Sequence, residues 1–197
     1  FLIDACGRAR DFPRVVQWLP RIHRLCLRVH MEAAFALCRP NYAQALVWRG
    51  LWPEAESELQ TAASDLSDFR APMAAEAVIR LAELRCRQGR FEEAAALFTA
   101  VGPDPLAHLG LGQLALARGG PATALVYCER YLRRLPPEAC AERASGLELL
   151  VPVLLAAGDI ERAKAAAGER YTLATRIGTA PCRDAARCAR RSDSSSC

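Results

Sequence analysis

Apolar residues in this chain recur at helical spacing, in blocks that end at single glycines. In the block before Gly89 they lie three and four residues apart, at Ala74, Ala77, Val78, Leu81 and Leu84. That spacing places the apolar side chains on one face of an α-helix. Alternation of Val, Ile or Thr with polar residues, which would indicate strands, is hard to find. The pattern therefore predicts an all-α protein.

The sequence around Gly89, LRCRQGRFEEAAALF, recurs along the chain. Five equivalent markers, the first without a glycine, lie 40, 39, 30 and 39 residues apart, at Arg10, Gly50, Gly89, Gly119 and Gly158. Two positions after each marker come Phe12, Trp52, Phe91, Pro121 and Ile160. Five positions after each marker come Val15, Ala55, Ala94, Ala124 and Ala163.

These positions describe a repeated helix–turn–helix pair. The marker glycine supplies the left-handed residue that ends the first helix. The residue two positions later fills the corner between the helices, and the small residue five positions later lets them approach closely. Each pair leaves an apolar face that only a neighbouring pair can cover, so the pairs should stack. We therefore expect a helical repeat domain over residues 1–176, with turns near residues 10–11, 50, 89, 119 and 158, and an irregular or disordered tail over 177–197.

The pattern resembles the tetratricopeptide repeat, a helix pair of about 34 residues. Gly112 follows Leu111 where that repeat has its Leu-Gly, and Pro136 falls where the repeat ends in proline. The resemblance implies a right-handed superhelical array of about five helix pairs. The wider spacing of 39 and 40 residues implies longer helices than in the simple repeat.

A narrower resemblance is carried by RDFPRVVQWLPRI, FALCRPNYAQALVWRGLWPEAESEL, MAAEAVIRLAELRCRQGRFEEAAALF and CERYLRRLPPE. These segments look like the helical-repeat region of actinobacterial LuxR-family transcriptional regulators. The resemblance implies a scaffold that receives a signal from a protein or peptide partner, or from a small effector, and sets the oligomeric or active state of a longer protein. The tail CRDAARCARRSDSSSC has no recognition-helix pattern, so DNA binding is carried over to no residue here. A free-standing tetratricopeptide adaptor is the alternative, and an α-helical enzyme is a third and disfavoured class.

Composition and charge narrow the function without naming it. The hydrophobic fraction of 52% is ample for a core, and the net charge of +4 is well short of a nucleic-acid-binding signature. The most apolar window, residues 147–157, is too short to span a bilayer, and no signal peptide is visible. We expect a cytoplasmic chain without membrane or direct nucleic-acid contact. The sequence leaves open whether the chain is a fragment of a longer protein and whether it forms homo-oligomers.

Candidate chemistry is sparse. No G-x-x-x-x-G-K-[ST] motif is present, and Lys164 lies inside a predicted helix. His23 and Cys26 share a helix face, but a closed zinc site needs four ligands. Glutamates such as Glu92 and Glu93 suit the start of a helix, where negative charge is favoured. The nine cysteines occur singly and are expected to be buried thiols. We expect no catalytic residue, metal or cofactor.

The tetratricopeptide register predicts a partner-binding groove lined by the first helix of each pair. A groove that mixes apolar and charged side chains can hold a peptide or a partner helix. We expect Trp48 to look across it towards Arg87, which occupies the equivalent position of the next repeat. The predicted groove residues are Gln44, Trp48, Glu76, Ile79, Glu83, Arg87, Gln113 and Glu148.

Overall fold

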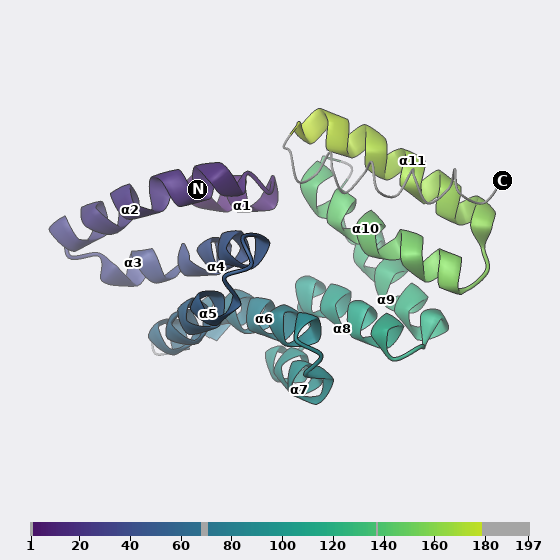
Figure 1. The fold of residues 1–197 in the computed structure, drawn as a ribbon, viewed down its shortest axis with the longest axis horizontal. Coiled ribbons are helices and arrows are strands. Elements are labelled where there is room, and N and C mark those ends of the chain that lie inside the picture. The colour runs from purple at the N-terminus through teal and green to yellow at the C-terminus, as the bar shows by residue number, and fades with distance from the viewer. Residues whose placement is uncertain (1, 68–70, 137, 179–197) are drawn as a thin grey trace. The chain divides into compact units, whose positions relative to one another are not determined.

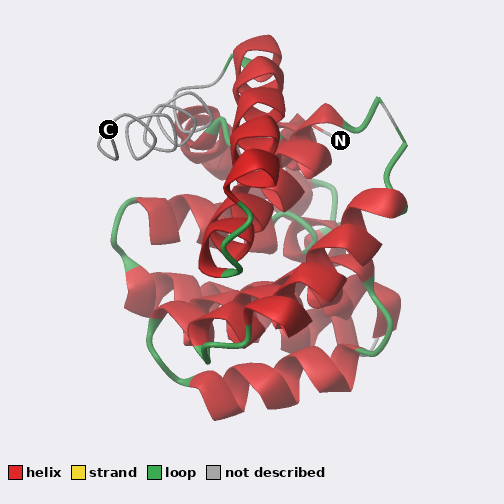
Figure 2. Cartoon of the chain, turned by 90° about the vertical axis from the view of Figure 1, so that its right-hand side faces the viewer, coloured by secondary structure: helices red, strands yellow, loops and turns green. Residues whose placement is uncertain are grey.

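The computed structural model describes residues 2–67, 71–136 and 138–178, and within these ranges it contains eleven α-helices and no strand (Figures 1 and 2). The chain divides into two compact units, Phe1–Gly102 and Pro103–Cys197. Unit 1 contains α1 (Leu2–Arg8), α2 (Phe12–Arg28), α3 (Glu32–Ala36), α4 (Arg39–Trp48), α5 (Trp52–Ser67), α6 (Ala71–Arg87) and α7 (Phe91–Val101). Unit 2 contains α8 (Pro105–Ala117), α9 (Pro121–Arg133), α10 (Cys140–Ala156) and α11 (Ile160–Ile177).

The helices form the predicted pairs. In unit 1, α1 packs against α2, α4 against α5 and α6 against α7, and the first helices α1, α4 and α6 also pack against one another in that order. In unit 2, α8 pairs with α9 and α10 with α11, while α8 contacts α10. The short helix α3 is an addition to the predicted pattern. The all-α repeat array is therefore confirmed, and its right-handed superhelical path stays a prediction.

All five marker residues adopt the left-handed conformation. Their φ angles are +54° at Arg10, +80° at Gly50, +76° at Gly89 and Gly119, and +79° at Gly158. In each case the next residue donates its backbone N–H to the carbonyl five positions back, as in Arg90 to Arg85 at 2.9 Å. This bond closes the last helical turn and aims the chain into the second helix. The predicted turns are confirmed, including the one at Arg10.

His30 is a sixth residue of this kind, which the glycine pattern did not reveal. Its φ is +52°, and Met31 donates its backbone N–H to the Cys26 carbonyl at 2.9 Å. This turn ends α2 and leads into α3. A left-handed residue with a side chain is strained relative to glycine, so the sequence alone had no reason to end a helix there.

The small residues five positions after each marker lie at the centre of the pairs. Val15, Ala55, Ala94, Ala124 and Ala163 are all at most 2% exposed. The corner residues are less uniform. Phe12 is buried and Phe91 is half-buried, but Ile160 is 47% exposed. The predicted corner plug is therefore wrong for the last pair, whose core is filled instead by Val153 and Leu154 of α10.

The tetratricopeptide-like features fall where the resemblance puts them. A side chain at Gly112 would bring a Cβ within 3.1 Å of Tyr127 and 3.3 Å of Leu149, so glycine permits the close approach of α8 to α9 and α10. Pro136 follows the end of α9. Helices α5 and α6 have 16 and 17 residues, whereas α7 and α8 have only 11 and 13. The short helices account for the 30-residue interval between Gly89 and Gly119.

The cysteines in the described ranges are buried or half-buried. Cys6, Cys26 and Cys128 lie in the core, and Cys38, Cys86 and Cys140 lie at its edge. Burial raises the pKa of the Cys128 thiol to about 12 and also raises the pKa of Cys6 and Cys38. These three thiols are therefore protonated at neutral pH. The remaining cysteines, at 182, 188 and 197, lie outside the described residues.

The predicted domain boundary at residue 176 lies one residue before the end of α11, where Gly178 caps the helix with a φ of +76°. The predicted irregular tail falls almost wholly on residues 179–197, outside the described ranges. Among the helices of the described ranges, none is both long and apolar enough to cross a bilayer.

Candidate partner-binding surface

Arg80 on α6 organises the face that α6 shares with α4. Its Nη1 donates to both carboxylate oxygens of Glu83 at 3.1 Å, and its Nη2 lies 3.5 Å from the Glu76 carboxylate. With its amide oxygen turned towards Arg80, Gln44 of α4 accepts from Nε at 2.8 Å and from Nη2 at 3.2 Å. We call these four residues, Gln44, Glu76, Arg80 and Glu83, the α4–α6 network.

The α4–α6 network follows from helical spacing. Glu76, Arg80 and Glu83 lie four and three residues apart on α6, so they share one face of that helix. Burial lowers the pKa of the Arg80 guanidinium, but Glu83 and Glu76 outweigh burial and leave the pKa raised. Arg80 therefore remains positively charged between the two carboxylates. The sequence prediction named three of its members but missed Arg80, although its position between two glutamates is a readable signal.

Trp48 and Arg87 extend this face. Trp48 lies one turn beyond Gln44 on α4 and is 54% exposed. Arg87 is the last residue of α6, is exposed, and has no carboxylate partner among the described residues. The ring of Trp48 contacts Phe12 of α2, with centroids 5.8 Å apart and planes tilted by 43°. The indole therefore rests against the neighbouring helix pair, and the expected approach of Trp48 to Arg87 stays a prediction.

Ile79 does not belong to this face. Its side chain is 0% exposed and forms part of the unit 1 core. It directly precedes Arg80 on α6, so it points about 100° away around the helix from the network. The predicted register was therefore one residue out at this position, and Ile79 offers no surface to a partner.

The two remaining predicted residues belong to unit 2. Gln113 is half-buried on α8. Glu148 on α10 pairs with Arg170 of α11, whose side chain is buried, at 3.6 Å. The structure thus brings Gln44, Glu76 and Glu83 into one network, with Trp48 and Arg87 on the same helices, and places Gln113 and Glu148 separately.

A second polar network in unit 1 joins α5, α6 and α7. Arg85 donates to the two carboxylate oxygens of Glu56 at 2.5 and 2.6 Å, and its Nε lies 3.4 Å from Glu93. Gln88 donates to Glu56 at 3.3 Å and accepts from Arg85 at 2.8 Å. We call Glu56, Arg85, Gln88 and Glu93 the interhelix network. The hydrogen bonds from Arg85, aided by Gln88, hold the pKa of Glu56 at about 2, while the Glu56 carboxylate raises the pKa of Arg85.

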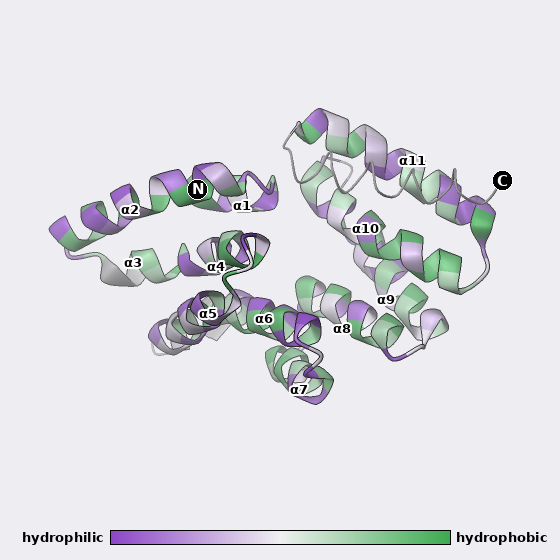
Figure 3. Cartoon of the chain, viewed as in Figure 1, coloured by the Kyte–Doolittle hydropathy of each residue, from purple (hydrophilic) through white to green (hydrophobic). Residues whose placement is uncertain are grey.

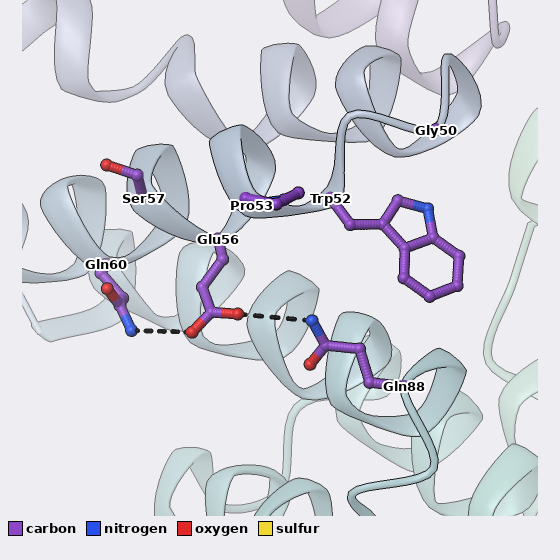
Figure 4. Close-up of a pocket in the computed structure, with 7 residues that line it drawn as sticks. All are labelled: Gly50, Trp52, Pro53, Glu56, Ser57, Gln60 and Gln88. Carbon is purple, nitrogen blue, oxygen red and sulfur yellow. Dashed lines mark hydrogen bonds between the residues drawn. The ribbon is translucent and has the colours of Figure 1, made fainter.

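An open pocket borders this second network (Figure 4). Its volume is about 660 Å³, and its lining comprises Gly50, Trp52, Pro53, Glu56, Ser57, Gln60 and Gln88. Figure 4 shows the Glu56 carboxylate between the amides of Gln60 and Gln88, with the Trp52 indole at the other end. The Glu56 carboxylate in this pocket is already bound by the buried Arg85, which joins α5, α6 and α7.

The residues considered as metal ligands, His23 and Cys26, make other contacts. The His23 ring stacks on Phe35 with centroids 4.2 Å apart, and Cys26 lies in the core. Across the part of the chain that the structure describes, no group of three or more His, Cys, Asp or Glu side chains is placed to hold a metal ion.

Comparison with known proteins places the fold. No protein-family model matches the sequence, and no curated protein matches it significantly. Among solved structures, the chain is similar to one from Podosopora anserina described as "kinesin light chain nearly identical TPR-like repeats". The TM-score is 0.51 at 15% identity, covering 91% of this chain and 94% of the other. The chain therefore has the fold of a tetratricopeptide-like repeat array.

Proposed function

We propose that this chain is a non-catalytic scaffold and that the face shared by α4 and α6 binds a segment of a partner protein. The observation that carries the proposal is the exposed Trp48 beside the α4–α6 network. Tryptophan and arginine dominate the binding energy of protein interfaces. Here an exposed indole and an exposed Arg87 lie on two neighbouring helices of one face.

The charges of this face suit an interface. The Arg80 guanidinium has two carboxylates and an amide within 3.5 Å, so its hydrogen bonds are made before any partner arrives. A partner that covers the network then displaces little tightly held water, which lowers the cost of polar desolvation. Trp48 is left to contact an apolar side chain, and Arg87 to donate hydrogen bonds to a carboxylate or a carbonyl oxygen.

A library of random peptides displayed on phage, selected against the purified chain, tests this proposal. Selected peptides are titrated against wild type, Trp48→Ala and Arg87→Ala, and thermal unfolding of each variant is measured in parallel. We expect at least tenfold weaker binding for Trp48→Ala with nearly unchanged unfolding. Val126→Ala on α9 is the control, because Val126 is also a large exposed apolar residue, at 53%. Equal binding by wild type and Trp48→Ala would reject the α4–α6 face.

The finer part of the proposal is a setting in transcription. The sequence resemblance supports a signal-receiving region of a LuxR-type regulator in the cytoplasm, whose partner is a protein segment, a small effector or a second copy of the chain. The alternative is a free-standing tetratricopeptide adaptor. The complete reading frame separates the two, since a helix–turn–helix module encoded beyond this chain is expected only for the regulator.

The proposal assigns no DNA contact to this chain. Specific recognition requires side chains placed at base edges, and the resemblance carries none over. In gel retardation we expect weak, salt-sensitive binding of duplex DNA without sequence preference. Salt-resistant binding to one sequence would contradict this part of the proposal.

A further inference from the structure

The second half of α2 presents an unusual surface, in which arginines and large apolar side chains are exposed together. Arg21, Arg24 and Arg28 are all exposed, and α2 contains no acidic residue. Beside them Leu25 is 55%, Leu27 46% and Met31 56% exposed. Figure 3 shows hydrophilic and hydrophobic residues side by side along this helix. Leu25 shares the face of the three arginines, whereas Leu27 lies about 200° around the helix from Leu25 and Met31 follows the end of α2. We call Arg21, Arg24, Leu25 and Arg28 the α2 patch.

The arginines of the α2 patch lack carboxylate partners within the described residues. Arg21 lies over the Trp18 ring at 4.9 Å, and Arg24 donates from Nε to the Pro20 carbonyl at 3.4 Å. Both contacts leave the ends of the guanidinium groups available. Elsewhere in unit 1, Arg39, Arg85 and Arg90 each have a carboxylate at 2.6 Å or less. Unpaired cations beside exposed apolar groups mark a surface that lacks its complement.

The geometry of the patch indicates the chemistry of that complement. Arg21, Arg24, Leu25 and Arg28 share one face of α2, because they lie three and four residues apart. A helix that lies on a membrane separates its apolar side from its basic side, but the apolar side of α2 is already buried in unit 1 through Phe12, Val15 and Leu19. Nucleic acid would pair with the arginines and leave the exposed Leu25 without a partner.

We propose that the α2 patch binds an acidic, amphipathic segment of a protein partner, with carboxylates on the three arginines and an apolar side chain on Leu25, which shares their face. Charge complementarity selects the partner, and burial of the apolar side chains holds it. This surface is separate from the α4–α6 face, so either proposal can fail alone.

The probe is a fluorescein-labelled synthetic helix of Glu and Leu with the leucines on one face. It is titrated by fluorescence anisotropy against the full chain, together with an isomer in which the leucines are scattered and a counterpart with Lys in place of Glu. We expect wild type to bind the amphipathic Glu peptide at least tenfold more tightly than either of the other two. Binding should weaken with salt, as expected for exposed charges.

Three variants locate the site. The triple reversal Arg21→Glu, Arg24→Glu and Arg28→Glu should weaken binding of the Glu peptide at least tenfold and increase binding of the Lys peptide. Leu25→Ser should weaken binding without that gain. The matched control reverses Arg130, Arg133 and Arg134, three exposed arginines at the end of α9, and should change the dissociation constant less than twofold. Circular dichroism checks that each variant is folded, and Arg24→Gln with Arg28→Gln serves if the triple reversal is not.

Val126→Ala on α9 should leave this binding unchanged. The proposal is overturned if the Glu peptide fails to bind at tens of micromolar, if the scattered isomer binds equally, or if the control reversal has the same effect as the patch reversal. It is also overturned if the binding of phosphatidylserine vesicles or duplex DNA depends on Arg21, Arg24 and Arg28 while the binding of the Glu peptide does not.

Discussion

Two arginines on α6, five residues apart, have different roles. Arg80 joins α6 to α4 through Gln44, which lies one helical turn before the exposed Trp48. Arg85 joins α6 to α5 and α7 through Glu56 and Glu93, and its side chain is only 5% exposed. Both are held by two carboxylates, but the carboxylates of Arg80 lie on its own helix, whereas those of Arg85 come from two other helices.

This difference separates a surface network from a structural one. Glu76 and Glu83 are fixed to the same helix as Arg80, so their ion pairs contribute little to holding one repeat on the next. Glu56 and Glu93 belong to the second helices of successive pairs, so the Arg85 bonds cross the boundary between repeats. The comparison predicts that losing Arg85 destabilises the fold, while losing Arg80 mainly alters the surface.

The largest expected effect comes from Arg85→Met. The substitution keeps the length of the side chain but leaves the Glu56 carboxylate without its bidentate donor. Removal of one partner from a buried pair costs about 3–5 kcal/mol, and the partial exposure of Glu56 lets water replace some of the lost bonds. We expect the free energy of unfolding, measured in urea, to fall by about 2–3 kcal/mol. A loss below about 1 kcal/mol would show that the interhelix network does not hold the repeats together.

Acid should remove part of the same stabilisation. The pKa of Glu56 is lowered from 4.5 to about 2 in the folded state. A lowered folded pKa stabilises the protein above the unfolded value, and this contribution disappears as the pH falls from about 4.5 to about 2. We expect the free energy of unfolding of wild type to exceed that of Glu56→Gln by roughly 2 kcal/mol at pH 7, after allowance for solvent screening.

Urea unfolding of both proteins between pH 7 and pH 2 measures this difference. The advantage of wild type should be constant above about pH 5 and should shrink at lower pH, because Glu56→Gln has no proton to gain at that position. A difference that stays constant down to pH 2 would show that the ionic form of Glu56 contributes nothing to stability.

The two networks were not equally readable from the sequence. The repeat spacing predicted the turns at Gly50, Gly89, Gly119 and Gly158, the turn at Arg10 and the buried small residues, because these depend on local backbone conformation and on helical periodicity. It also selected Gln44, Glu76 and Glu83, since equivalent positions of the repeat, and positions seven residues apart, share a helix face. The contact of Trp48 with Phe12 was missed because it joins helices 36 positions apart in the sequence. Glu93 was interpreted as a helix-start charge, and only the packing of three helices shows that Arg85 reaches both Glu93 and Glu56.

Ile79 and His30 show the limits of a periodic argument. Assigning Ile79 to the surface assumed that the groove positions of all repeats share one register, but the neighbouring Arg80 takes the surface position and Ile79 enters the core. His30 ends α2 in a conformation that glycine adopts more easily, so no residue preference marks that turn. In both cases tertiary packing decides between local alternatives that the sequence leaves nearly equal.

Arg80→Met is the matched counterpart of Arg85→Met and should cost less. Glu76 and Glu83 are already partly exposed, so both can be hydrated when the guanidinium is gone. Partly exposed ion pairs contribute about 0–1 kcal/mol, and the hydrogen bond to Gln44 adds a similar amount. We expect the free energy of unfolding to fall by about 1 kcal/mol, together with weaker binding of peptides selected on the α4–α6 face. A stability loss equal to that of Arg85→Met would remove the distinction between the two networks.

The smallest effect is expected for Glu76→Gln, because Arg80 has a better partner. Glu83 offers both carboxylate oxygens at 3.1 Å, whereas Glu76 lies at 3.5 Å and its side chain is 37% exposed. Loss of the longer and more exposed ion pair should change the free energy of unfolding by less than about 0.5 kcal/mol. Glu83→Gln should lower the free energy of unfolding more than Glu76→Gln in the same urea titration. The double variant should lose more stability than the sum of the two single variants, since either carboxylate alone still neutralises Arg80. Strictly additive losses would mean that the two glutamates act independently, and that the α4–α6 network is a set of separate pairs around one arginine.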